Sequence, residues 1–252
     1  INSLAQLAKK HQIPLVVDAT LSSPYLVDFK TLGVDIVLYS TTKYLSANGS
    51  TIGGAIVDLG NFDWQNASHS TVQEMYSDYY EFAYLRYLRK LITDYGTIQI
   101  PFNAFMTEIG LETLSLRMEK HSHNALQLAT LLSNHKDILK VSYPGLKNHP
   151  FHANALSIFK NGYGGFFTFE LKDKQYCFKL LNALRIAKIA TNLGDSRTLV
   201  IHPASTIYQA LTEEEQNLAG VNDRLIRVSV GLENVLDLQN DFEQALHKME
   251  KA

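Results

Sequence analysis

Two short apolar runs, each followed by side chains that can do chemistry, constrain this chain most. The first run, Ile13–Val17, ends in Asp18, and the second, Val34–Tyr39, is followed by Ser40-Thr41-Thr42 and then Lys43. Continuous apolar runs of this length are typical of strands buried on both faces of a parallel sheet. The connection between them is long enough for a crossover, so we expect the two strands to be parallel neighbours.

Ligands of open parallel sheets bind beyond the carboxyl ends of the strands, where Asp18 and Lys43 both fall. A carboxylate there could keep a basic ring nitrogen protonated, and a lysine could react with an aldehyde. Hydroxyl groups beside the lysine could bind a phosphate. The alternative is a turn or cap aspartate and a solvated lysine, and the pattern alone leaves both interpretations open.

The remaining periodicity predicts an α/β domain in residues 1–110 and an α+β domain in residues 111–252. Glycines 49, 53 and 54 flank a third apolar run, Ile52–Val57, and a long helix from Phe102 to Asn134 is expected to bend near Gly110. Thr212, with a glutamate three residues later, predicts a capping box. Further strands and helices are expected at Gly162–Leu171, Lys174–Arg185, Leu225–Val230 and Val235–Lys248.

Composition excludes several classes of function. The formal net charge is −2, so nothing favours binding to nucleic acid, and no apolar run is long enough to span a membrane. His121 and His123 stand two apart on an expected helix and point apart, so we expect no metal site. A single cysteine, Cys177, allows no internal disulfide and fits a cytoplasmic location.

The ordered motifs resemble one known family. VVDATLSSPYL and GVDIVLYSTTKYLSANGSTIGGAIVD are followed by PFNAFMTEIGLETLSLRMEKHSHNA, VSYPGL, GGFFTFEL, NLGDSRTLVIHPAST and LIRVSVGLENVLDL. Together they closely resemble the Cys/Met metabolism enzymes that depend on pyridoxal phosphate, and the resemblance covers essentially the whole chain. It implies an aspartate-aminotransferase-like fold (fold type I), here with an incomplete, mainly parallel large domain and a C-terminal α+β domain.

The resemblance also implies roles for residues of the first domain. Lys43 corresponds to the lysine that forms the Schiff base with pyridoxal phosphate and carries protons. Asp18 corresponds to the partner of the pyridine nitrogen, and Thr20 lies where the family has a threonine near the ring. Ser40 and Thr42 correspond to phosphate ligands. The family commonly has Gly-Gly-His-Gly after the lysine, whereas this chain has residues 46–49 as Ser-Ala-Asn-Gly.

In the second domain, Arg227 stands on an expected strand with small residues on its face, where a guanidinium could bind a carboxylate. From the pattern alone an exposed strand arginine is the competing interpretation. By resemblance, Arg227 corresponds to the residue that binds the substrate α-carboxylate. Asn192 lies where relatives carry a residue near the same carboxylate, and an ordinary turn asparagine is its alternative.

The segment NLGDSRTLVIHPAST resembles O-acetylhomoserine sulfhydrylases more than other members, although Ile207-Tyr208 stands where those enzymes usually have Thr-His. The implied reaction is γ-replacement on O-acetyl-L-homoserine by sulfide or a thiol, which gives homocysteine or methionine. The chemistry of cystathionine synthases and lyases or of methionine γ-lyase is the alternative within the family.

The family has a substantial segment before the helix that precedes Asp18, and it supplies a ring-stacking aromatic residue and further phosphate ligands. This chain begins at INSLAQLAKK without an initiator Met, so we expect it to lack that N-terminal part. The resemblance further implies a homotetramer, a dimer of dimers with shared active sites. A third possibility is a cofactor-free remnant with only a structural or assembly role.

Overall fold

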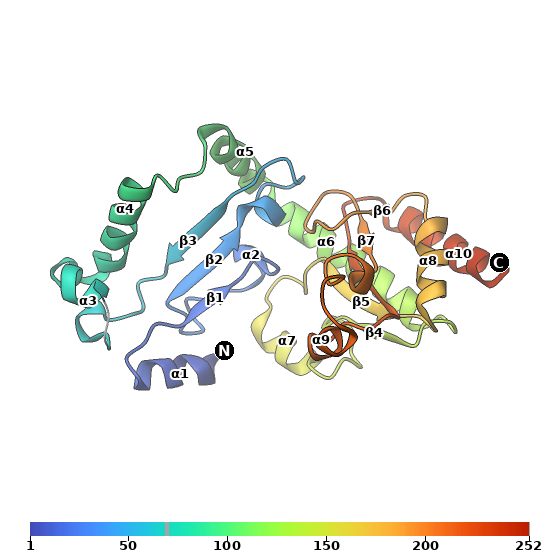
Figure 1. The fold of residues 1–252 in the computed structure, drawn as a ribbon, viewed down its shortest axis with the longest axis horizontal. Helices are drawn as coiled ribbons and strands as arrows, with labels where there is room; N and C mark the ends of the chain where they lie inside the picture. Colours follow the sequence, from blue (N-terminus) through green and yellow to red (C-terminus); the bar gives the residue numbers. More distant parts are fainter. Residues whose placement is uncertain (69–70, 252) are drawn as a thin grey trace.

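The structure is a computed structural model and describes residues 1–68 and 71–251. Figure 1 shows an elongated molecule in which two groups of elements are joined through α6. The N-terminal group comprises α1 (Asn2–Lys10), β1 (Val16–Asp18), α2 (Ser23–Leu26), β2 (Ile36–Ser40), the π-helical turn η1 (Thr41–Leu45), β3 (Gly54–Asp58), η2 (Trp64–Asn66), α3 (Thr71–Tyr76), η3 (Ser77–Phe82), α4 (Ala83–Tyr95) and α5 (Pro101–Glu112).

The C-terminal group comprises α6 (Leu114–Ser133), β4 (Lys140–Ser142), α7 (His152–Ile158), β5 (Phe166–Glu170), α8 (Lys174–Ala183), β6 (Lys188–Ile189), β7 (Leu199–Ile201), η4 (Pro203–Ser205), α9 (Glu213–Leu218), β8 (Leu225–Ser229) and α10 (Val235–Lys251). The capping box is confirmed, because the side chains and backbone amides of Thr212 and Glu215 bond reciprocally. Among the described residues, no helix is long and apolar enough to cross a membrane.

The N-terminal sheet has the strand order β1-β2-β3. Strands β1 and β2 are parallel, with Asp18 opposite Leu38, which confirms the predicted parallel pair. Strand β3 returns antiparallel to β2. Val16 on β1 and Ile56 on β3 are 47% and 50% exposed, so apolar side chains remain on the surface at both edges of this sheet.

The C-terminal sheet has the order β4-β5-β8-β7-β6, in which all neighbours are antiparallel except β6 and β7. The main hydrophobic core is formed by this sheet together with helices α6, α8 and α10. It includes Leu128, Phe167, Val228 and Phe242, all at most 1% exposed. In β8 the side chains of Ile226 and Val228 are fully buried. This burial follows the predicted alternation and leaves Arg227 on the other face.

In place of one helix from Phe102 to Asn134 bent near Gly110, the structure has two helices, α5 and α6, that meet at Thr113, three residues beyond the predicted bend. Helix α5 ends in close contact with η1. A Cβ atom added to Gly110 would lie 2.2 Å from the carbonyl oxygen of Leu45. Helix α6 also contacts η1 near its start, through Arg117, and farther along it packs against β4 and β5 of the C-terminal sheet. The division of the chain into two domains near residue 110 stays a prediction.

Candidate active site

The carboxyl ends of β1 and β2 are joined by hydrogen bonds between their polar residues. Asp18 ends β1, is exposed, and accepts a hydrogen bond from the backbone N–H of Thr20 at 2.9 Å. The hydroxyl oxygen of Thr20 in turn accepts one from the backbone N–H of Ser40 at 2.9 Å. Because Ser40 ends β2, these bonds hold the predicted carboxylate and hydroxyl groups at one edge of the sheet.

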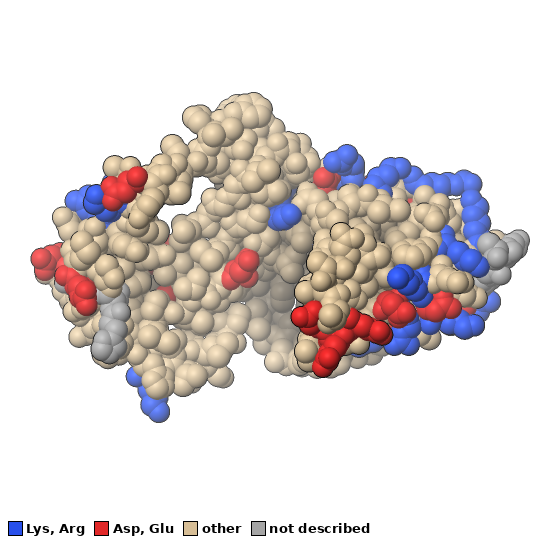
Figure 2. All heavy atoms as spheres, viewed as in Figure 1, with Lys and Arg blue, Asp and Glu red and all other residues tan. Residues whose placement is uncertain are grey.

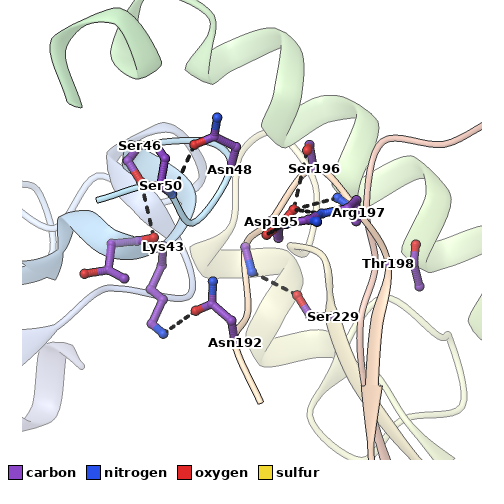
Figure 3. Close-up of polar contacts among 12 residues, drawn as sticks. Lys43, Ser46, Asn48, Ser50, Asn192, Asp195, Ser196, Arg197, Thr198 and Ser229 are labelled. Atoms are coloured by element: carbon purple, nitrogen blue, oxygen red, sulfur yellow. Dashed lines mark hydrogen bonds and ion pairs between the residues drawn. The ribbon is translucent and has the colours of Figure 1, made fainter. Parts of the chain in front are cut away.

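Lys43 lies in the turn η1 directly after β2, with φ −92° and ψ −127°, which interrupts the helical geometry of the turn. Its Nζ atom donates a hydrogen bond to Oδ1 of Asn192 at 2.6 Å, as Figure 3 shows. The pKa of Lys43 is held below the ordinary lysine value, first by partial burial and then by the charge of Arg227. A larger fraction of this amine is therefore neutral, and able to act as a nucleophile or base, than in a solvated lysine.

Arg227 reaches the same place from strand β8. Its Nη2 atom donates hydrogen bonds to the backbone carbonyls of Thr191 at 2.6 Å and Asn192 at 3.1 Å. Its guanidinium lies over the ring of Phe166, with 5.9 Å to the ring centre, and burial lowers the pKa of Arg227. Asn192 thus contacts Lys43 through its side chain and Arg227 through its backbone, and the structure brings these three predicted residues together.

The two predicted phosphate ligands differ in their present contacts. The hydroxyl of Thr42 accepts a hydrogen bond from the backbone N–H of Gly53 at 3.1 Å and donates a long one, 3.4 Å, to its carbonyl. A bond of 3.4 Å is weak, so this proton could turn to a phosphate at small cost. Ser40 is partly buried, and its backbone is fixed by Thr20, so its hydroxyl is held at the sheet edge.

The charges of the site suit a ligand with anionic groups. Among the described residues, neither Lys43 nor Arg227 has a carboxylate within ion-pair distance. The buried carboxylate of Asp195 is nearby in Figure 3, but Arg197 occupies it with two hydrogen bonds of 3.0 Å. Lys43 and Arg227 are two cations with lowered pKa values, and both donate hydrogen bonds to the neutral residue Asn192. This arrangement favours binding of a phosphate or a carboxylate. The residues present therefore fit pyridoxal phosphate and an amino acid.

Gly194 is a site residue that the sequence reasoning missed. It has φ +72°, and an added Cβ would lie 2.7 Å from the backbone nitrogen of Tyr44 and 3.1 Å from the carbonyl carbon of Lys43. Its N–H donates to the hydroxyl of the fully buried Ser229 at 2.9 Å. The loop that carries Asn192 thus packs directly on the peptide after Lys43. The only sequence signal was the Asn-Leu-Gly turn, which does not reveal what the turn contacts.

These elements define an α/β protein with a lysine and an aspartate at the carboxyl ends of parallel strands. The family profile described as Cys/Met metabolism PLP-dependent enzyme matches residues 1–247, and the chain belongs to this family. The expected fold type I is thereby confirmed.

Known proteins similar to this chain include homocysteine synthase of Schizosaccharomyces pombe, 42% identical over 96% of this chain and 60% of its own length. O-acetyl-L-homoserine sulfhydrylase of Leptospira meyeri is 38% identical over 98% of this chain and 60% of its own. A crystal structure of a putative O-acetylhomoserine (thiol)-lyase from Campylobacter jejuni, containing N'-pyridoxyl-lysine-5'-monophosphate, matches with a TM-score of 0.89 and 34% identity, over 98% of this chain and 62% of that one. The chain therefore spans about 60% of the length of these relatives.

Proposed function

We propose that this chain carries the lysine and the substrate arginine of a pyridoxal-phosphate-dependent enzyme. The reaction is γ-replacement: O-acetyl-L-homoserine and sulfide, or a thiol, give homocysteine or methionine and acetate. The observation that carries the proposal is the contact of Lys43, whose pKa is lowered, with Asn192, which also binds Arg227. The names of the relatives from Schizosaccharomyces pombe and Leptospira meyeri support the choice of reaction.

Bound pyridoxal phosphate supplies an aldehyde for a lysine amine and a protonated ring that withdraws electrons. Asp18, at the end of β1, would pair with the ring nitrogen and keep it protonated through its negative charge. Ser40 and Thr42, at the end of β2, would donate hydroxyl protons to the phosphate, and Thr20 would contribute to the ring site. The bond from Thr20 to Ser40 keeps these groups at a fixed spacing.

Lys43 would hold the cofactor and would move protons, because its lowered pKa leaves a larger neutral fraction of the amine that can accept one. Arg227 binds the α-carboxylate of the amino acid with its guanidinium, which has no anionic partner among the described residues. Asn192 orients the Lys43 amine through its 2.6 Å hydrogen bond and contributes to the same carboxylate site.

We also propose a cytoplasmic homo-oligomer. Helix α5 exposes Phe102, Phe105 and Ile109, which are 64%, 58% and 43% exposed. In Figure 2 the surface at the top of the view, where α5 lies in Figure 1, carries few charges. Exposed apolar patches of this kind mark contacts between proteins. The single cysteine, which is buried and reduced, agrees with the cytoplasm.

The first test is cofactor binding. Pyridoxal phosphate added to the protein should give a visible absorbance band, and borohydride reduction should fix the cofactor on Lys43, as found by peptide mass spectrometry. Lys43→Ala should abolish both, while the matched exposed lysine variant Lys90→Ala should change neither. No band in the unmodified protein would refute the proposal and would favour a structural or assembly role.

The second test is the reaction. Homocysteine and acetate should form in equal amounts from O-acetyl-L-homoserine and sulfide. Release of ammonia and a 2-oxo acid in place of homocysteine would instead assign elimination chemistry.

A further inference from the structure

Three polar side chains of helix α6 are buried along one face. Arg117, His121 and Asn124 stand at positions i, i+4 and i+7, so they share a side of the helix. They are 8%, 0% and 0% exposed. We call these three residues the α6 polar ladder. Each of them bonds to a backbone carbonyl outside α6, so the ladder ties distant segments to one helix.

Arg117 connects α6 to the turn that carries Lys43. Its Nη1 atom donates to the carbonyl of Tyr44, the residue after Lys43, at 2.6 Å. Its Nη2 atom donates to the carbonyl of Gly110, and its Nε atom donates to the hydroxyl of Thr113 at 3.1 Å. One guanidinium thus joins the Lys43 turn, the end of α5 and the start of α6.

His121 and Asn124 connect α6 to the chain just after β8, the strand that carries Arg227. The Nδ1–H of His121 donates to the carbonyl of Val230 at 2.6 Å, and burial lowers the pKa of His121 to about 4, so the ring is neutral at pH 7. The amide of Asn124 donates to the carbonyls of Gly231 and Glu233 at 3.0 and 2.9 Å.

The ladder is continuous through an aromatic contact. The ring of Tyr44 meets the ring of His121 edge-on, with 5.1 Å between centres. Tyr44 is 1% exposed and directly follows Lys43. The Lys43 turn therefore contacts two steps of the ladder, through the Tyr44 carbonyl and through the Tyr44 ring.

Burying the charged guanidinium of Arg117 costs free energy, so packing alone does not account for it. Among the described residues Arg117 has no carboxylate partner, and the acceptors of its three hydrogen bonds are neutral oxygens. Apolar side chains of similar volume often stabilise a core as well as or better than buried charged groups. What the guanidinium provides, and an apolar side chain cannot, is a rigid fork that fixes several backbone carbonyls relative to one another.

We propose that the α6 polar ladder positions Lys43 relative to Arg227, with Arg117 setting the lysine turn and Asn124 setting the end of the arginine strand. This inference rests on the proposed function, since it gives these residues an effect on cofactor and substrate binding. It assigns the three residues a positioning role, because none of them reaches Lys43 Nζ or Arg227.

The test compares Arg117→Met, Asn124→Ala and the control Leu132→Ala. Leu132 is a fully buried residue of α6 that belongs to the core of the C-terminal sheet and makes no ladder contact. For each protein we would measure the melting temperature, the affinity for pyridoxal phosphate from the visible band, KM and kcat for the amino acid, and backbone hydrogen exchange.

Arg117→Met should weaken pyridoxal phosphate binding about tenfold or more, as expected for loss of hydrogen bonds from a charged donor. It should also speed hydrogen exchange in residues 42–46. Asn124→Ala should raise KM about tenfold with cofactor affinity within about twofold, and should speed exchange in residues 229–233. Leu132→Ala should lower the melting temperature while leaving cofactor affinity and KM within about twofold, because distant sites act nearly independently.

Equal losses of cofactor affinity in Arg117→Met and Leu132→Ala, after matching for melting temperature, would overturn the proposal and leave the ladder a core feature. A missing band in the unmodified protein would count against the proposed function alone. Hydrogen exchange would then test the positioning role of the α6 polar ladder. Faster exchange of residues 42–46 in Arg117→Met than in Leu132→Ala supports this role, and equal exchange in the two variants overturns it.

Discussion

Replacing Gly194 by alanine should destabilise the protein by about 2–5 kcal/mol, for two separable reasons. The residue has φ +72°, a conformation that costs an L-residue about 1–2 kcal/mol. The new Cβ would also lie 2.7 Å from the nitrogen of Tyr44 and 3.1 Å from the carbonyl carbon of Lys43. Both neighbours are backbone atoms that cannot rotate away, and overpacking of this kind costs about 1–3 kcal/mol.

Gly220 offers a matched control for the backbone part of this cost. It has nearly the same φ, +74°, but nothing lies within 4 Å of its added Cβ. Gly220→Ala should therefore cost only about 1–2 kcal/mol. The difference between the two variants in the free energy of unfolding, measured by urea denaturation, isolates the contact with the Lys43 turn.

Gly194→Ala should also weaken pyridoxal phosphate binding, because the loop that carries Asn192 must move away from Lys43. Gly220→Ala should leave that binding unchanged. Equal free energies of unfolding in the two variants, together with unchanged cofactor affinity, would refute the packing of this loop on the Lys43–Tyr44 peptide.

Three further substitutions test individual side chains. Arg227→Leu removes a cation that lowers the pKa of Lys43, so this pKa should rise toward the ordinary value and the pH profile of borohydride-trapped cofactor should move to higher pH. The same variant should raise KM for the amino acid about 10- to 100-fold. Asp241→Ala should cost about 3 kcal/mol in urea denaturation, since this buried carboxylate accepts from three backbone amides in residues 185–187. Thr212→Ala should cost about 1 kcal/mol, seen as a small loss of melting temperature, because it removes the capping box of α9.

The sequence predicted the parts of the site that depend on local pattern. The parallel pairing of β1 and β2 was predicted from two apolar runs. The alternation along β8 placed Arg227 on the face of the strand opposite to that of the buried Ile226 and Val228. A bend near Gly110 was expected, whereas the exact boundary between α5 and α6 at Thr113 was not. The close contact of Gly110 with Leu45 joins residues 65 positions apart in the chain, and no local signal records such a contact.

Arg117 shows the same limit for polar residues. An arginine in a helix is ordinarily solvated, and periodicity does not distinguish one whose guanidinium binds the carbonyl of Tyr44, 73 positions away. The sequence did carry one signal. Arg117 stands three residues after Leu114 and four before His121, so it shares a side of the helix with an apolar residue and a histidine.

The use of an amide between Lys43 and Arg227 has a physical reason. A carboxylate in place of the side-chain amide of Asn192 would pair with Lys43, stabilise the charged lysine and raise its pKa. The neutral amide instead holds the Lys43 amine at 2.6 Å while leaving the repulsion from Arg227 in place. Partial burial, together with this repulsion, favours loss of the Lys43 proton, and the guanidinium of Arg227 has no carboxylate partner among the described residues. One side chain thus satisfies two requirements that an ion pair would set against each other.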